Sequence, residues 1–392
     1  MSRIKKIQQA VKIFSKTDIG IALWIVLGWK VLMSIIGFAI DVHFGGAASF
    51  FDHTMHWDAG WYLAIIHGQY VDILASSAFY PLFPLLVSVV HSLGFGLIDY
   101  PISGQIVNTI ALWFALVAAL KITTTLIGKS EKKWIIILIL CAPAAFFLHV
   151  FYSEAIFMAL SFWAYYLALT RRWFSVGVLL ALLTATRLPS VLIVALCGLE
   201  FLRAYDWKPK QFFNKKILFF LLAPLGFIGY SIYLSFAQAD PFGMFHAYSH
   251  TTDWIYQVFN PNIIETIAKA LYQIVRSLIG LRPFNSELFV NIMLPLASLF
   301  LLGLASIYLF GKTRRKYLPL GIVGILSIIM FTLNSNVVSV HRYVLPSLTI
   351  YIAVMVFIKN IKKPYILYIG CFLGLIIQAF LYVAFVRVLF AG

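Results

Sequence analysis

Repeated apolar runs of roughly 20 residues dominate this chain of 392 residues. A run of that length crosses the hydrocarbon core of a bilayer as an α-helix, which satisfies its own backbone hydrogen bonds. Only 11% of the residues are charged and 62% are hydrophobic, whereas a soluble domain carries about 25% charged residues. The sequence lacks the segments of alternating hydrophobicity that a transmembrane β-barrel needs. We therefore expect an all-α polytopic membrane protein.

Short basic stretches separate the apolar runs and hold most of the 30 lysines and arginines, which give a formal net charge of +16. The positive-inside rule places such stretches in the cytoplasm. Membrane topology therefore explains the charge, and no nucleic-acid partner is expected. The first apolar run is longer than the about 7–15 residues of a signal-peptide core, so we interpret it as a retained span.

The alternation of apolar runs and basic stretches predicts about 11 spans, with the N-terminus in the cytoplasm and the C-terminus outside. One stretch, from Pro81 to about Gly96, does not fit, because a full span there would place the basic residues 129–133 outside. We interpret it as a juxtamembrane or re-entrant helix on the outer side; a ten-span arrangement is the alternative. The expected spans are 19–40, 104–128, 134–150, 154–170, 173–186, 188–204, 216–237, 288–311, 317–334, 343–358 and 365–388.

We expect the whole chain, 1–392, to form a single integral membrane domain. Within its later outer loop, apolar residues recur on one helical face, which predicts an amphipathic helix on the outer membrane surface. These residues are Ile264, Ile267, Leu271, Ile274 and Leu278. The expected parts are a cytoplasmic tail (1–18), a seven-span module (19–237) with a long outer loop (41–103), a second outer loop (238–287) and the C-terminal spans (288–392).

The first outer loop contains the segment His56-Trp57-Asp58-Ala59-Gly60-Trp61-Tyr62, in a region from about Asp41 to Tyr80 that has no lysine or arginine. A carboxylate that reaches a hydroxyl group can act as a general base, and the aromatic rings can stack on a sugar. The alternative is that Asp58 caps a helix starting near Ala59 and that the rings belong to the interfacial aromatic belt.

Other ionisable residues lie at the expected outer ends of spans, where such residues are usually functional. Glu154 opens one span, although the helix dipole alone favours a glutamate there. Arg187 lies between two spans, where its guanidinium can bind a phosphate, neutralise Glu154 or reach lipid headgroups. His341-Arg342, followed by Tyr343, is a similar candidate in a later outer loop. Lys30, inside the first span, needs a partner that the sequence does not identify.

The sequence gives little sign of a metal or nucleotide site. The region from about Asp41 to Tyr80 holds four histidines and four aspartates, but HxH, HExxH and DxD spacings are absent. Scattered histidines are more often hydrogen-bonding residues than ligands. Glycine-rich phosphate loops are also absent. The three cysteines lie in apolar runs, as buried small hydrophobic residues do. We therefore expect no cofactor, and metal dependence stays open.

In their order along the chain, several motifs resemble the PIG-V family, which comprises GPI mannosyltransferase II and its bacterial relatives. The likeness covers most of the chain, and Arg187-Leu188-Pro189-Ser190 departs from the family's Arg-Ser/Pro-x-Gly. The motifs are His56-Trp57-Asp58 with Trp61-Tyr62, Gly68-Gln69-Tyr70, Ala78-Phe79-Tyr80-Pro81-Leu82-Phe83-Pro84, Tyr152-Ser153-Glu154, Thr186-Arg187, Asp240-Pro241-Phe242 with Trp254, and His341-Arg342-Tyr343 with Pro346.

The resemblance implies a GT-C glycosyltransferase fold with juxtamembrane helices in the first outer loop. It also implies a polyprenyl-phosphate sugar donor, most often of mannose, an unidentified hydroxyl acceptor, and inverting displacement, with a partner subunit in some members. Asp58 would be the base and Glu154 a second acidic residue of the site. Substrate would be bound by His56, Trp57, Trp61, Tyr62, Arg187, His341, Arg342 and Tyr343.

Two other classes of function compete with the transferase. A polytopic transporter or a flippase of lipids or glycans is the main alternative, although transporters usually show two matched halves with broken helices, and no such pairing is apparent. A non-catalytic subunit is the third class, and it would tolerate loss of Asp58. Turnover of a lipid-linked sugar separates the transferase from both.

Overall fold

The computed structural model describes residues 13–46, 48–70, 74–129, 132–208, 210, 214–247, 259–312, 315–361 and 365–392. Across these residues the chain is all-helical apart from one isolated bridge between Phe259 and Asn334. Six of the described segments are long and apolar enough to cross a membrane, as expected for a multi-pass membrane protein. They are α2 (Asp18–His43), α5 (Tyr100–Leu126), η5 with α10 (Lys215–Leu222 and Leu225–Ala237), α13 with η8 and α14 (Ser286–Leu288, Phe289–Met293 and Leu294–Gly311), η9 with α15 (Arg315–Tyr317 and Leu318–Thr332), and α18 (Tyr365–Val386).

Other apolar runs form shorter helices than the sequence predicted. The run expected to span 134–150 is α-helical only in α6 (Trp134–Leu140) and continues as the 3-10 helix η3 (Ala145–Leu148), because Pro143 cannot continue an α-helix. Similarly, α17 (Leu348–Ile361) begins after Pro346 rather than at residue 343. The remaining short apolar helices are α7 (Glu154–Leu169), α8 (Trp173–Thr184) and α9 (Ser190–Ala204).

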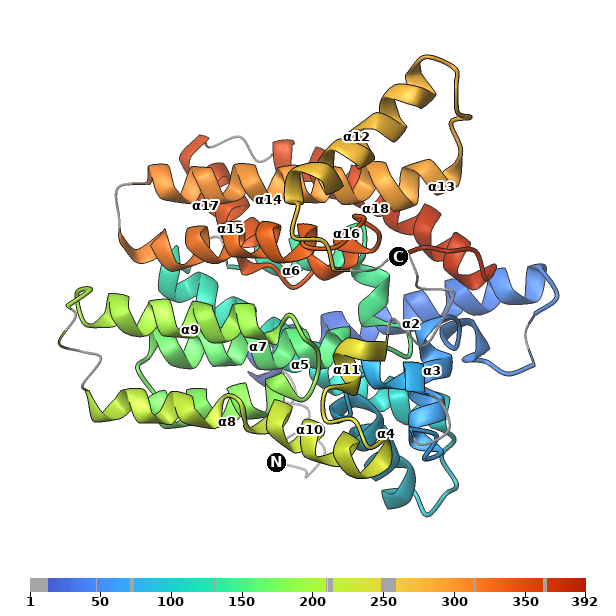
Figure 1. Ribbon diagram of the computed structural model, residues 1–392, viewed down its shortest axis with the longest axis horizontal. Helices are drawn as coiled ribbons and strands as arrows, with labels where there is room; N and C mark the ends of the chain where they lie inside the picture. Colours follow the sequence, from blue (N-terminus) through green and yellow to red (C-terminus); the bar gives the residue numbers. More distant parts are fainter. Residues whose placement is uncertain are drawn as a thin grey trace, which may run out of the picture.

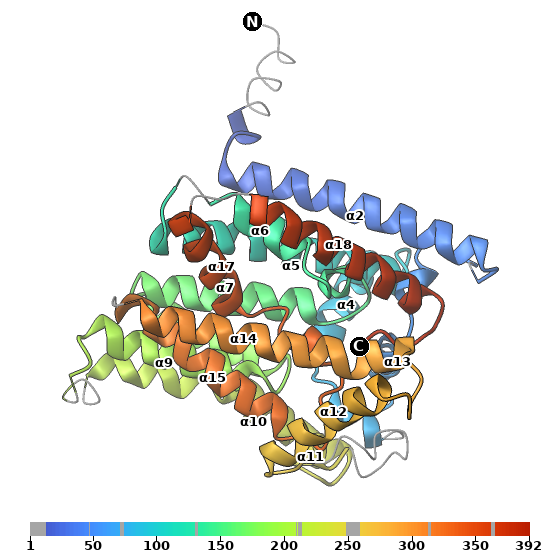
Figure 2. The ribbon, with the colours of Figure 1, turned by 90° about the horizontal axis from the view of Figure 1, so that it is seen from above.

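The helix α7 lies at the centre of the helix bundle, where it packs against α5, α8 and α9 (Figure 1). In the C-terminal part, α14 packs against α15 and α17, and α15 joins the two groups through its contact with α9. The helices α2 and α18, from opposite ends of the chain, lie side by side (Figure 2). This packing lets loops from both halves of the chain meet where α7 begins.

The outward faces of several spans are apolar. A soluble protein rarely exposes so large an apolar surface, whereas a spanning helix turns such a face to lipid. The buried core instead concentrates aromatic rings just before α7, at Phe146, Phe147, Phe151 and Tyr152. Exposed apolar side chains include Trp24, Val31, Leu32 and Ile35 on α2, Phe300 and Ile307 on α14, and Phe372 and Ile376 on α18.

The long loop between α2 and α5 carries two short α-helices that pack together, α3 (Asp58–Ile66) and α4 (Leu82–Leu93). It also contains the 3-10 helices η1 (Asp52–Thr54) and η2 (Leu74–Ala78). The helix α4 occupies most of the stretch from Pro81 to Gly96. Its 12 residues extend over about 18 Å, while the hydrocarbon core is about 30 Å thick. By itself α4, like the equally long α8, is therefore too short to span the bilayer.

The amphipathic helix expected in the second outer loop is α12 (Ile263–Leu278), and part of its apolar face is exposed. The same loop contains the short helix α11 (Gly243–His246). The short helix α16 (Val340–Tyr343) follows α15 and carries the His341-Arg342 pair. Trp254, which belongs to one of the quoted motifs, lies outside the described residues, as does the tail before residue 13.

Candidate functional site

Four charged side chains from four separate segments meet where α7 begins. The Arg342 guanidinium donates from Nη1 to Asp58 Oδ2 at 2.6 Å and from Nε to Glu154 Oε1. The same Glu154 oxygen accepts a hydrogen bond from Arg187 Nη1. The pairing of Arg187 with Glu154 was one of the alternatives open from the sequence. The link from Arg342 to both carboxylates had no sequence signal.

The turn before α3 fixes the position of Asp58. The Tyr152 hydroxyl accepts a hydrogen bond from the Asp58 backbone N–H at 3.1 Å and donates one to the His56 carbonyl at 3.3 Å. Trp57 is the N-cap residue, has a φ of 56° and makes no side-chain capping bond. A non-glycine residue in this left-handed region is uncommon and often marks a functional site. Asp58 is thus the first residue of α3 and not its cap, so the capping alternative does not describe its role.

Glu154 is buried beneath the two arginines. It is 2% exposed, and its Oε2 atom has no hydrogen-bond partner among the described residues. A buried carboxylate needs an opposite charge and hydrogen bonds, which Arg187 and Arg342 supply. A hydrogen bond of 2.8 Å between the hydroxyls of Tyr62 and Ser153 ties α3 to the start of α7. Because Arg187 and Arg342 both donate to Glu154 Oε1, this buried carboxylate fixes the orientation of both guanidinium groups.

Aromatic rings fix the two guanidinium groups as well. The Arg342 guanidinium carbon lies 4.5 Å from the ring centre of Tyr152 and 5.0 Å from that of Phe147, and Arg187 lies 5.3 Å from that of Tyr343. Such cation–π contacts strengthen where water is excluded. Burial lowers the pKa of Arg342, but the carboxylates of Glu154 and Asp58 more than offset it, so the pKa lies well above its usual value. Arg342 therefore keeps its positive charge.

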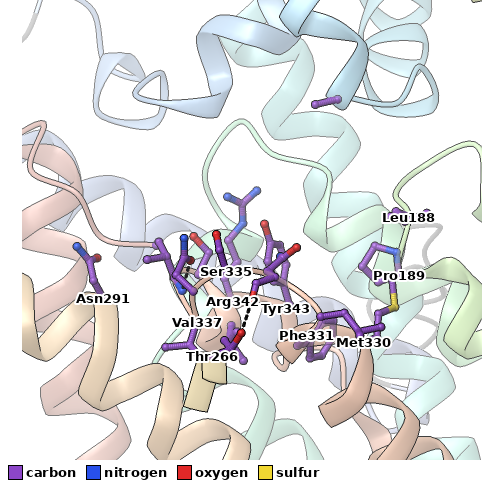
Figure 3. Close-up of a pocket in the computed structure, with 18 of the residues that line it drawn as sticks. Leu188, Pro189, Thr266, Asn291, Met330, Phe331, Ser335, Val337, Arg342 and Tyr343 are labelled. Atoms are coloured by element: carbon purple, nitrogen blue, oxygen red, sulfur yellow. Dashed lines mark hydrogen bonds between the residues drawn. The ribbon is translucent and has the colours of Figure 1, made fainter. Parts of the chain in front are cut away.

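A cavity of about 2390 Å³ opens over this cluster and is large enough for a drug-sized or larger ligand. The Asp58 side chain is 26% exposed, and its Oδ1 atom has no hydrogen-bond partner in the part of the chain that the structure describes. Figure 3 shows Arg342 and Tyr343 between Asn291 at one end of the view and Pro189 at the other. Of the residues predicted for the site, those that line the cavity are Trp57, Asp58, Trp61, Tyr62, Arg187, Arg342 and Tyr343.

The two predicted histidines lie away from the cavity wall. The His56 ring packs against Phe385 at 5.7 Å, and the His341 Nε2 atom lies 3.0 Å from the Ala391 carbonyl oxygen. Burial lowers the pKa of His341 to about 4, so its ring is neutral at neutral pH and brings no positive charge to a phosphate. His341 instead ties α16 to the chain segment after α18.

The partners of Lys30 are neutral. Its Nζ atom donates to Gln105 Oε1 at 2.9 Å and to the carbonyls of Leu148 and His149 at 3.3 and 3.2 Å. Carbonyl oxygens satisfy a buried ammonium through charge-assisted hydrogen bonds. Lys30 thereby fixes α2 and α5 to the turn that precedes α7, and so supports the floor of the charged cluster.

The sequence did not indicate the roles of several residues of the site. Tyr152 belongs to the Tyr152-Ser153-Glu154 motif, but its hydrogen bonds to the turn around Asp58 depend on the fold. Polar cavity residues from α12 and from the loop after α15 lie in segments that carried no motif; they are Thr266, Lys269, Gln273, Asn334 and Asn336. Within the described ranges, no three His, Cys, Asp or Glu residues are grouped as a metal site requires.

Comparison with models of known protein families and with curated protein sequences found no match to this chain.

Proposed function

We propose that this protein is a multi-pass membrane glycosyltransferase of the GT-C type. It transfers a sugar, mannose by the resemblance to PIG-V proteins, from a polyprenyl-phosphate donor to a hydroxyl acceptor outside the cytoplasm. One observation carries the proposal: an accessible carboxylate, Asp58, and two arginines line the same cavity. Tryptophan and tyrosine side chains on the same wall offer stacking surfaces for a sugar.

In the proposed reaction, Asp58 is the general base. Its Oδ1 atom takes the proton from the acceptor hydroxyl as that oxygen attacks the anomeric carbon of the donor. The bond between the anomeric carbon and the phosphate oxygen breaks, and the polyprenyl phosphate leaves with the bonding electrons. Because the displacement occurs in one step from the opposite face, the configuration at the anomeric carbon is inverted.

The two arginines stabilise the leaving group. Guanidinium groups form two parallel hydrogen bonds with phosphate oxygens, and donors fixed in advance stabilise developing charge best. Glu154 and the aromatic rings hold Arg187 and Arg342 in place. Glu154 is thus a positioning residue in this proposal, since it does not line the cavity.

We also propose a membrane topology for this protein. The six long helices and the shorter apolar ones together form about 11 spans. The N-terminal tail is cytoplasmic, the first seven spans form the catalytic module, and the charged cluster faces the extracytoplasmic side. The shorter helices lie among the long ones, where protein rather than lipid covers their ends.

The experiment is a donor-consumption assay on purified protein in lipid nanodiscs. Polyprenyl-phosphate-mannose is supplied with membrane-extracted acceptors, and polyprenyl-phosphate-glucose is tested in parallel. The proposal expects protein-dependent release of polyprenyl phosphate together with glycosylated product. If neither donor is consumed, the transferase proposal fails and the transporter alternative takes its place.

A further inference from the structure

Polar residues from the C-terminal half of the chain line another part of the same cavity. We call it the amide lobe and define it by Thr266 and Gln273 of α12, Arg282 of the following loop, Asn291 of η8 and Asn336 of the loop before α16. All five residues line the cavity. Figure 3 shows Asn291 and Thr266 on separate elements. Chain segments that are distant in sequence thus build one polar wall of the cavity that Asp58 and Arg342 also line.

The orientation of α12 is the reverse of that in a soluble amphipathic helix. Its polar residues Thr266 and Gln273 line the cavity, while Ile264 and Leu278 on its apolar face are 81% and 80% exposed. In a soluble protein the apolar stripe faces the core. A helix at the membrane surface instead turns its apolar face to lipid. The polar face of α12 is then available to a ligand in the cavity.

Asn291 supplies an acceptor that is not used within the protein. It lies in the π-helical segment Phe289–Met293, between α13 and α14. Turns of π-helix are rare in proteins overall, but those that occur are often at functional sites. Its Oδ1 atom is buried and, among the described residues, has no hydrogen-bond partner. An unsatisfied buried acceptor destabilises the folded protein. Because the Asn291 side chain lines the cavity, rotation of its amide group would bring this acceptor to a ligand hydroxyl and satisfy it.

The charges of the lobe are paired within the protein. Arg282 donates to Gln273 Oε1 at 3.0 Å and lies 3.3 Å from Glu287 Oε1. Lys269, at its edge, is 2.5 Å from Glu265. The lobe therefore presents amide and hydroxyl dipoles and little net charge. Amides both donate and accept hydrogen bonds, as do the hydroxyl groups of a sugar. A neutral, polyhydroxylated ligand fits this wall better than a phosphate.

We propose that the amide lobe is a binding site for the uncharged glycan portion of a ligand. That this ligand is the acceptor rests on the proposed function, because Asp58 and Arg342 line the same cavity as the amide lobe. The binding itself does not depend on turnover. A glycan held here would present a hydroxyl group toward the charged cluster.

The test is the affinity of the nanodisc-embedded protein for three neutral trisaccharides: mannotriose, maltotriose and chitotriose. Titration calorimetry compares the wild type with Asn291→Leu, which removes the amide at similar size. The matched control is Leu278→Ala, on the exposed apolar face of α12. We expect at least one trisaccharide to bind, with a Kd at least tenfold higher in Asn291→Leu and unchanged in Leu278→Ala. Asn291→Ser replaces Asn291→Leu if the latter does not fold, with the same expected loss.

Two results would overturn the proposal: no trisaccharide binds the wild type, or Asn291→Leu binds as tightly as the wild type. The results also distinguish a failure of the lobe proposal from a failure of the transferase proposal. If donor turnover is intact and the acceptor KM is the same in Asn291→Leu, the lobe proposal fails and the transferase stands. If binding depends on Asn291 but no donor is consumed, the lobe stands and the transferase fails.

Discussion

The burial of Glu154 predicts that its charge matters more for folding than the charge of Asp58. Glu154 is 2% exposed between two arginines, whereas the Asp58 side chain is 26% exposed. Breaking a buried ion pair costs about 3–5 kcal/mol, because the remaining charge stays buried without compensation. A more exposed ion pair contributes about 1 kcal/mol or less. We expect Glu154→Gln to lower the free energy of unfolding by about 3–5 kcal/mol, and Asp58→Asn by about 1 kcal/mol.

Reversible unfolding in mixed micelles, with increasing SDS and circular dichroism as the signal, measures both changes under the same conditions. Glu154→Asp is the matched control, because it keeps the charge and shortens the side chain. It should be destabilised less than Glu154→Gln. Equal destabilisation by Glu154→Gln and Asp58→Asn would refute the reasoning, since Glu154 would then not depend on burial between Arg187 and Arg342.

Three further predictions follow from single residues. Burial lowers the pKa of His341 from 6.5 to about 4, so between these values the unfolded chain binds a proton that the folded protein does not. The free energy of unfolding should therefore fall by up to about 3 kcal/mol as the pH drops through this window. His341→Gln should lose this pH dependence, and a variant that keeps it would contradict the prediction. Tyr152→Phe removes the hydroxyl that holds the turn around Asp58, and should cost about 1–3 kcal/mol in unfolding experiments; wild-type stability would argue against that role. A cysteine in Ser49→Cys should react with an impermeant thiol reagent from outside, and labelling from the cytoplasmic side alone would overturn the topology.

The helical, multi-pass character of the fold was predictable from the sequence because apolar length is a strong local signal. The ends of helices were less predictable. Pro143 ended α6 early, and α17 began only after Pro346. A proline acts through local sterics, but whether the chain then kinks or leaves the helix depends on what packs around it.

The individual residues of the site were predictable from the sequence, but the contacts among them were not. Asp58, Glu154, Arg187 and Arg342 each stood out as an ionisable residue near a membrane surface. Asp58 and Arg342 are 284 positions apart in the sequence, so only the fold brings them together. The partners of Lys30 include backbone carbonyls, which leave no trace in a sequence.

The most direct measurement is the rate of sugar transfer by Asp58→Asn relative to wild type, in nanodiscs and with saturating polyprenyl-phosphate-mannose. A general base contributes about 10²–10⁴-fold to a rate. We expect transfer to fall by at least about 100-fold while the unfolding transition stays close to that of the wild type. Transfer at the wild-type rate in a folded Asp58→Asn protein would contradict the assignment of Asp58 as the base.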